Sequence, residues 1–169
     1  MSRRHRAEKR DTHPDPVYNS ILLSKFINKI MQRGKKALAE KIVYKAFNII
    51  DLKHKVNPIE AFNLAIQNVK PFLELSSVRI GGANYQVPKP VDEYRGHMLA
   101  IKWIIESSKK RSEKVMVERL SNEIFDAYSN RGTSIKKKDD THKMAEANKA
   151  FSHFNVKKNK DNQSNQNHQ

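Results

Sequence analysis

The chain has 169 residues, with 33 Lys and Arg against 18 Asp and Glu, so its formal net charge is +15. Apolar residues make up 37% of it, which suits one hydrophobic core with polar extensions better than two domains. The absence of cysteine excludes a disulfide framework, a thiolate zinc site and a cysteine nucleophile. A charge excess of this size favours a polyanionic partner, either nucleic acid or an anionic membrane surface. The longest apolar run is only four residues, at 98–101, so we expect no spanning helix and no membrane partner.

The two ends of the chain are predicted to lie outside the core. Residues 1–17 show no apolar periodicity and are expected to form a basic, flexible arm. The five cations of this arm are Arg3, Arg4, Arg6, Lys9 and Arg10. Residues 155–169 are rich in Asn and Gln and are expected to be a disordered tail. The folded domain is then 18–154.

Apolar residues recur at helical spacing in six stretches of the domain. Ser20 begins the first stretch and Gly34 ends it. Asn57, Pro58 and Glu60 are typical of a capped helix start, and Pro71 ends that helix. The predicted helices are 20–34, 36–52, 58–70, the segment after Asp92, 112–132 and 133–151. The core aromatics are expected to be Phe26, Phe47, Phe62, Trp103 and Phe125.

The last predicted helix is polar around most of its circumference. We expect it to pack by its C-terminal half and to project its Lys-rich start. Before it in the chain, residues 72–91 show a different pattern, in which apolar residues flank Gly81 and Gly82. Glycine supplies the positive φ angles of a tight reversal, so this stretch is predicted to be a two-stranded β-hairpin.

Enzymatic and metal-dependent functions find little support in the sequence. The seven histidines are scattered, and none has the spacing that places two ligands on one helical face. Asp139 and Asp140 are explained by local charge balance after three lysines. The segment 33–36 lacks the glycine and the hydroxyl of a phosphate-binding loop, since Lys29 and Lys36 stand in those places. We therefore expect no enzyme, no metal, no cofactor and no small-molecule substrate.

Basic residues cluster in the arm and at the predicted helix ends. Besides the arm, the clusters are 33–36, 109–111 and 136–138. Any one Lys-rich loop can simply be solvated, but several of them in one small domain favour a protein that binds the phosphate backbone.

Three long motifs then point to a known family. Residues 78–88 read VRIGGANYQVP, 99–103 read LAIKW, and 136–151 read KKKDDTHKMAEANKAF. In this order and spacing, they closely resemble bacterial-type small-subunit ribosomal protein seven. The resemblance runs from the Ser2-Arg3-Arg4 start to about Phe154.

The resemblance implies a mainly α fold, a bundle of six helices with a protruding two-stranded β-hairpin between the third and fourth. It implies a primary rRNA-binding protein that binds the 3′ major domain of 16S-type rRNA, nucleates assembly of the subunit head and takes part in translation. Its expected place is cytoplasmic, in the small subunit of a bacterial-type ribosome, with an organellar matrix as the alternative. The implied neighbours are exit-site tRNA, mRNA and small-subunit ribosomal proteins nine and eleven.

By position, the resemblance also implies binding residues. Besides the arm cations, those implied to bind rRNA are Lys35, Lys36, Arg79, Arg95, Lys109, Lys110, Arg111, Lys136, Lys137 and Lys138. Those implied to lie near tRNA or mRNA are Gly81, Gly82, Asn84, Tyr85, Lys143 and Lys149. The stretch before Gly81 departs from the family pattern, because many relatives have two consecutive arginines where this chain has only Arg79.

Two other functions compete with rRNA binding. A helical DNA-binding regulator would also be small and basic, but it needs a recognition helix with polar side chains for base edges, and no predicted helix shows one clearly. A nuclease or RNA-modifying enzyme would need the metal or nucleophile motifs that are missing.

Overall fold

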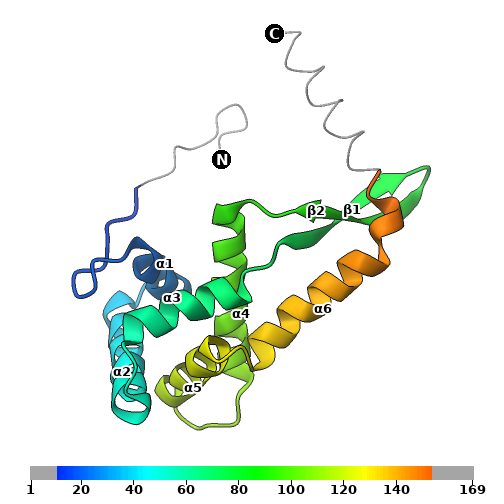
Figure 1. The fold of residues 1–169 in the computed structure, drawn as a ribbon. Helices are drawn as coiled ribbons and strands as arrows, with labels where there is room; N and C mark the ends of the chain where they lie inside the picture. Colours follow the sequence, from blue (N-terminus) through cyan, green and yellow to red (C-terminus); the bar gives the residue numbers. More distant parts are fainter. Residues whose placement is uncertain (1–10, 154–169) are drawn as a thin grey trace.

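The computed structural model describes residues 11–153, so the arm cations Arg3 to Arg10 and the tail predicted at 155–169 lie outside the described residues. Six α-helices surround one core, and a β-hairpin leaves the bundle between the third and fourth helices (Figure 1), which confirms the predicted fold. The elements are α1 (Ile21–Ile30), α2 (Lys36–His54), α3 (Pro58–Val69), β1 (Leu73–Ile80), β2 (Ala83–Pro90), α4 (Glu93–Lys110), α5 (Met116–Tyr128), α6 (Thr133–Ala147) and the short 3₁₀ helix η1 (Lys149–Phe151).

Local sequence signals explain where two of the helices begin. The Ser20 hydroxyl accepts a hydrogen bond from the Leu23 N–H at 3.3 Å, which caps α1. The Asn57 side chain caps α3 by accepting from the Ile59 N–H at 3.3 Å. Glu60 completes this cap differently from the expected capping box, because it accepts from the Asn57 side-chain amide at 2.9 Å.

Two predicted helix boundaries are displaced. α1 ends at Ile30, before the predicted stop at Gly34, since Met31 already has extended backbone with ψ of 132°. α5 begins at Met116 and not at Ser112, because Val115 is extended and Glu113 turns back toward Arg111, with an Oε1 to Nε distance of 3.0 Å. Helical periodicity does not report these local backbone changes, which set both boundaries.

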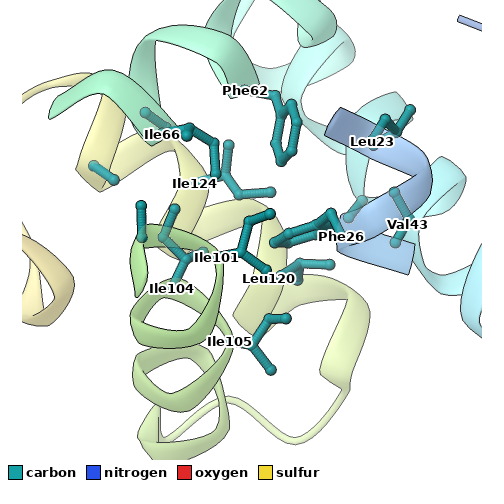
Figure 2. Packing of buried hydrophobic residues seen from close by; sticks show 14 of the residues in the cluster. Leu23, Phe26, Val43, Phe62, Ile66, Ile101, Ile104, Ile105, Leu120 and Ile124 are labelled. Carbon is teal, nitrogen blue, oxygen red and sulfur yellow. The ribbon is translucent and has the colours of Figure 1, made fainter. Parts of the chain in front are cut away.

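The hydrophobic core joins all six helices around α5, which packs against α2, α3, α4 and α6. Figure 2 shows Phe26 from α1 beside Ile101 from α4 and Leu120 from α5, and the ring of Phe62 from α3 packs on that of Phe26 with centroids 5.0 Å apart. These four side chains are at most 1% exposed. Burying each contributes about 1.5–3 kcal/mol to the stability of the bundle. Of the aromatics predicted for the core, only Phe125 is half-buried, and its ring stacks on His54 with centroids 3.4 Å apart.

The hairpin is regular from its base to its tip. β1 and β2 pair antiparallel from Leu73 opposite Pro90 to Ile80 opposite Ala83. The two-residue turn has positive φ at both Gly81 and Gly82, 57° and 89°, as a type I′ turn requires. A lone hairpin is marginal in water, and here α6 and η1 lie along it and support it (Figure 1).

The packing predicted for the last helix is confirmed for its C-terminal half and for the exposed Lys136 and Lys137, but its first turn is buried and does not project. α6 buries its first turn, with Ser134 fully buried and Ile135 in the core, and it buries Thr141 and Ala145 farther along. Its C-terminal half lies along the hairpin, away from the bundle. The polar start is tolerated inside because a carboxylate from α5 satisfies the polar groups of Ser134, as described below.

The folded domain begins earlier in the chain than predicted, within the last residues of the segment 1–17. Asp15 is only 3% exposed, and its carboxylate accepts hydrogen bonds from the N–H groups of Val17 and Tyr18 and from the hydroxyl of Tyr44, the last at 2.6 Å. Burial, together with this hydrogen bond, raises the pKa of Tyr44 well above its usual value. The loop before α1 is thus part of the folded domain from Asp15 onward.

Candidate nucleic-acid interface

The turn between α1 and α2 and the C-terminal end of α4 share one groove of about 330 Å³. Lys35 and Lys109 stand on its rim, with Arg33 beside them. Its floor is apolar and includes Ile30, Met31, Leu38, Ala39, Ile42 and Met116. Two clusters that lie more than 70 residues apart in the sequence therefore face one concavity.

The α1–α2 turn holds its cations outward through its backbone. Arg33 and Gly34 both have positive φ, 53° and 73°, so the chain reverses sharply. The Lys35 N–H bonds to the Gln32 carbonyl at 3.1 Å, which closes the turn. Lys35 and Lys36 are exposed, and Lys36 makes only a 3.7 Å ion pair with Glu40 in the same helix. An exposed pair of this kind contributes little, so Lys36 remains available to an anion.

A second pocket, of about 250 Å³, adjoins the other side of the α4 terminus. It is lined by Ser107, Lys110, Arg111, Ser112, Glu113 and Thr133. Thr133 is the first residue of α6, so this pocket joins the cluster 109–111 to the helix that carries 136–138. The two pockets are thus lined by residues of two predicted basic clusters, 33–36 and 109–111, while the arm lies outside the described residues.

Arg111 differs from its neighbours Lys109 and Lys110 because its guanidinium is paired with carboxylates of the same chain. It contacts Glu113 at 3.0 Å, Glu123 at 2.9 Å and Asp126 at 2.7 Å. These carboxylates raise the pKa of Arg111, although its burial acts in the opposite direction. Hydrogen bonds, from Asn122 first and also from Arg111, lower the pKa of Glu113 to about 2. No such partner is found for Lys109 or Lys110 within residues 11–153, and both side chains are exposed.

The three lysines at the start of α6 do not behave alike. Lys136 and Lys137 are exposed. Lys138 turns inward, with its side chain 19% exposed and its ammonium donating to the Asn68 carbonyl at 2.8 Å. Lys138 therefore fastens α6 to α3, which leaves Lys136 and Lys137 as the outward cations of this cluster.

The predicted hairpin cations lie in two different settings. Arg79 is exposed near the tip, opposite Asn84. Arg95 sits at the base, where its Nε donates to Glu74 at 3.2 Å, and Lys89 contacts the same carboxylate at 3.0 Å. Burial alone would raise the pKa of Glu74, but the hydrogen bonds from these two cations lower it overall.

The residues expected near tRNA or mRNA also separate into groups. Gly81, Gly82 and Asn84 form the exposed tip of the hairpin. Tyr85 packs on the ring of Phe151, with centroids 5.3 Å apart, so the aromatic side chain helps to hold η1 on the hairpin. Lys143 and Lys149 are exposed along α6 and η1, and Lys149 contacts Glu146 at 3.4 Å.

Two residues of this region were not among the binding residues implied by the resemblance. Arg33 lines the first groove, and it already belonged to the predicted basic cluster 33–36. Glu123 is fully buried and binds Arg111, but an acidic residue inside an amphipathic pattern gave no signal of that partner.

Between residues 11 and 153, no group of three or more His, Asp or Glu side chains is arranged to hold a metal ion. Within that part of the chain, each helix is too short or too polar to cross a bilayer.

The fold and the basic surface define a class of small, basic helical proteins with a hairpin arm. A family profile described as Ribosomal protein S7p/S5e matches residues 2–149. The chain is 68% identical over 158 residues to small ribosomal subunit protein uS7 of Rickettsia rickettsii strain Sheila Smith, a match that covers 94% of this chain and 99% of the relative. The same protein of Rickettsia bellii strain RML369-C is 66% identical over 160 residues, covering 95% and 98% of the two chains.

The chain therefore belongs to the ribosomal protein S7p/S5e family, in its bacterial type. This confirms the resemblance seen in the three sequence motifs. Members of this family are structural, RNA-binding components of the small ribosomal subunit and are not enzymes, so the predicted class of function and location in a bacterial-type small subunit are confirmed as well. The DNA-binding and enzymatic alternatives are set aside.

Proposed function

We propose that this protein is a primary rRNA-binding protein that binds the 3′ major domain of 16S-type rRNA and nucleates assembly of the subunit head. The observation that carries the proposal is that Lys35 and Lys109 line one groove at the end of α4, while Lys110 lines a second pocket at the same end. Cations that come from separate helix ends can hold separate RNA segments together, which is what nucleation of a domain requires.

The outward cations form the proposed phosphate-binding surface. They are Lys35, Lys36, Lys109, Lys110, Lys136 and Lys137, with Arg33 added from the groove. Arg79 is proposed as a separate contact on the hairpin, while Arg95 and Lys138 are already engaged by Glu74 and Asn68. The five arm cations remain part of the proposal from their sequence positions.

The salt dependence of binding tests this surface. Affinity for a transcript of the 3′ major domain should fall steeply with KCl, because each neutralised phosphate releases roughly one counterion. Replacing Lys35 and Lys36 with alanine should weaken binding and lower the slope of log K against log salt by up to about two units.

A control variant separates contact from net charge. Lys45→Ala with Lys53→Ala removes the same charge from exposed positions along α2, away from the turn. This variant should keep nearly the slope of the original protein. A flat salt dependence of the original protein would contradict the proposal, and equal slopes for the two double variants would remove the α1–α2 turn from the surface.

We further propose that the hairpin tip and α6 lie near exit-site tRNA and mRNA, and that ribosomal proteins nine and eleven of the same subunit are neighbours. The supporting observation is that β1, β2 and α6 extend together away from the bundle (Figure 1), so they can reach ligands beyond the rRNA surface. A photoreactive residue in place of Asn84 should crosslink to tRNA or mRNA in assembled subunits. Crosslinks to 3′-domain rRNA alone would contradict this placement.

A further inference from the structure

Arg111 and Glu123 form a bridge between two parts of the proposed RNA surface. The Arg111 side chain is 24% exposed, and three carboxylates occupy its guanidinium. Glu123 is fully buried on α5, and its Oε2 binds Arg111 Nη1 at 2.9 Å. The Nε and Nη1 of Arg111 are therefore engaged by carboxylates, and an RNA phosphate would have to compete with these negative groups.

The other oxygen of Glu123 holds the start of α6. Glu123 Oε1 accepts from the Ser134 N–H at 3.1 Å and from the Ser134 hydroxyl at 2.7 Å. The N-cap position of α6 is Gly132, which has no side chain to cap the helix. Glu123 therefore acts as the cap of α6 from a neighbouring helix, and its negative charge suits the positive end of the helix.

Outward cations lie directly beside both ends of this bridge. Lys109 and Lys110 immediately precede Arg111 at the end of α4. Lys136 and Lys137 follow Ser134 in the next residues of α6. One buried carboxylate thus links the residue that follows α4 to the first turn of α6.

We propose that Arg111 and Glu123 are positioning residues for RNA binding, which hold the lysine pairs of α4 and α6 in register with their phosphates without touching the RNA. The inference rests on the proposed function and reassigns Arg111 from a phosphate contact to a structural tie. It implies that affinity for rRNA depends on Glu123, although a negative charge by itself should weaken binding to RNA.

The variant Glu123→Gln separates the two roles. It makes the protein one unit more positive, so a purely electrostatic view expects equal or tighter binding to the 3′-domain transcript. The positioning role expects binding weaker by about tenfold, since one well-placed charged contact is lost. The salt slope should stay unchanged, because no phosphate-binding cation has been removed.

Glu106→Gln is the matched control. Glu106 is exposed on α4 and contacts only Lys102, at 3.8 Å, so its replacement changes the charge equally without touching the bridge. Binding by this variant should be equal to or slightly tighter than that of the original chain. Weakened binding in Glu123→Gln but not in Glu106→Gln supports the positioning role, and equal binding in both overturns it.

A second variant covers the case in which Glu123→Gln does not fold. Arg111→Lys keeps the charge but loses the planar fork that holds several carboxylates at once. It should bind several-fold more weakly with the salt slope unchanged, whereas Lys110→Ala should lower the slope by about one unit. A drop of about one unit for Arg111→Gln would show a direct phosphate contact and overturn the inference.

The outcomes also separate this inference from the proposed function. A flat salt dependence for the full-length original chain would end both. Steep salt dependence together with unimpaired Glu123→Gln binding would leave the rRNA-binding proposal intact and remove only the positioning role.

Discussion

Gly96 is a position where the lack of a side chain serves close packing. It is buried in α4, and a Cβ there would lie 2.8 Å from Cγ and 3.1 Å from Cδ of Lys70. Lys70 is half-buried and contacts Glu93 at 3.7 Å. The glycine thus lets the chain entering the hairpin lie against α4.

We predict opposite effects of Gly96→Ala in two backgrounds. Alanine favours a helix over glycine by about 1 kcal/mol, but displacing Lys70 costs about 1–3 kcal/mol. In the original chain, the variant should therefore be neutral or destabilising. In a Lys70→Ala chain, where the obstructing atoms are gone, it should stabilise by about 1 kcal/mol. Urea unfolding of the four proteins measures this, and an equal effect in both backgrounds would contradict the steric explanation.

His142 is held neutral by its place at the hairpin base. Its Nε2 accepts a hydrogen bond from the Phe72 N–H at 3.1 Å, which a protonated ring cannot do. Burial, and then Lys138, lower its pKa below the usual 6.5, while Asp139 acts in the opposite direction. Protonation would remove the tie between α6 and the start of β1.

The lowered pKa of His142 predicts a loss of stability on acidification. The unfolded chain takes up the proton near pH 6.5, but the folded chain resists it, so this contribution is complete above pH 6.5 and falls as the pH drops toward the folded pKa. His142→Gln should flatten the pH dependence of the unfolding free energy between about pH 7.5 and 5.5. An NMR titration that gives His142 a pKa at or above 6.5 would contradict the assignment.

At the scale of elements, the turn of the hairpin restricts which residues its two positions can accept. Both of its glycines have positive φ. Asparagine tolerates this conformation and β-branched residues do not. Gly81→Asn should therefore be nearly neutral, whereas Gly82→Val should destabilise the hairpin by about 1–2 kcal/mol.

Hydrogen exchange should detect that difference locally. Amides of β1 and β2 should exchange about tenfold faster in Gly82→Val, while core amides of α5 stay protected, because the hairpin can open without the bundle. Equal exchange in the two turn variants would contradict a type I′ requirement.

The elements that the sequence predicts well are those with local signals. Asn57 and Pro58 mark the start of α3, and Gly81 and Gly82 mark the hairpin, because capping and turn chemistry depend on adjacent residues. The start of α5 and the burial of the first turn of α6 were not predicted, because both involve side-chain partners. Glu113 pairs with Arg111 within the connection before α5, and Glu123 pairs with Arg111 twelve residues away, and periodicity carries no information on such contacts.

The same limit applies to the candidate site. Basic clusters are visible in the sequence, and the structure brings Lys35, Lys109 and Lys110 to adjoining pockets. Composition alone could not separate these outward lysines from Arg111 and Lys138, which are engaged internally. Which cations remain available is a property of tertiary structure.

For the whole molecule, the net charge of +15 predicts a protein that is stabilised by salt when alone. Repulsion among the cations opposes the compact state, and the Debye length shrinks from about 30 Å at 0.01 M salt to about 8 Å at 0.15 M. Raising KCl over this range should raise Tm by roughly 3 °C, equivalent to about 1 kcal/mol for a chain of this size. A Tm that stays level or falls would show that attractive pairs such as Arg111 with Glu123 outweigh the repulsion.

The position of the hairpin tip depends on how rigidly the base of the hairpin is held. Each strand has eight residues, which at about 3.3 Å per residue give a reach of about 26 Å. A tilt of about 5° at the base would carry the tip through about 2 Å over that length. Two side chains hold this base. Glu74 contacts Lys89 and Arg95, and His142 accepts a hydrogen bond from the Phe72 N–H. Small movements of these side chains at the base would therefore produce larger displacements of Gly81 and Gly82 at the tip.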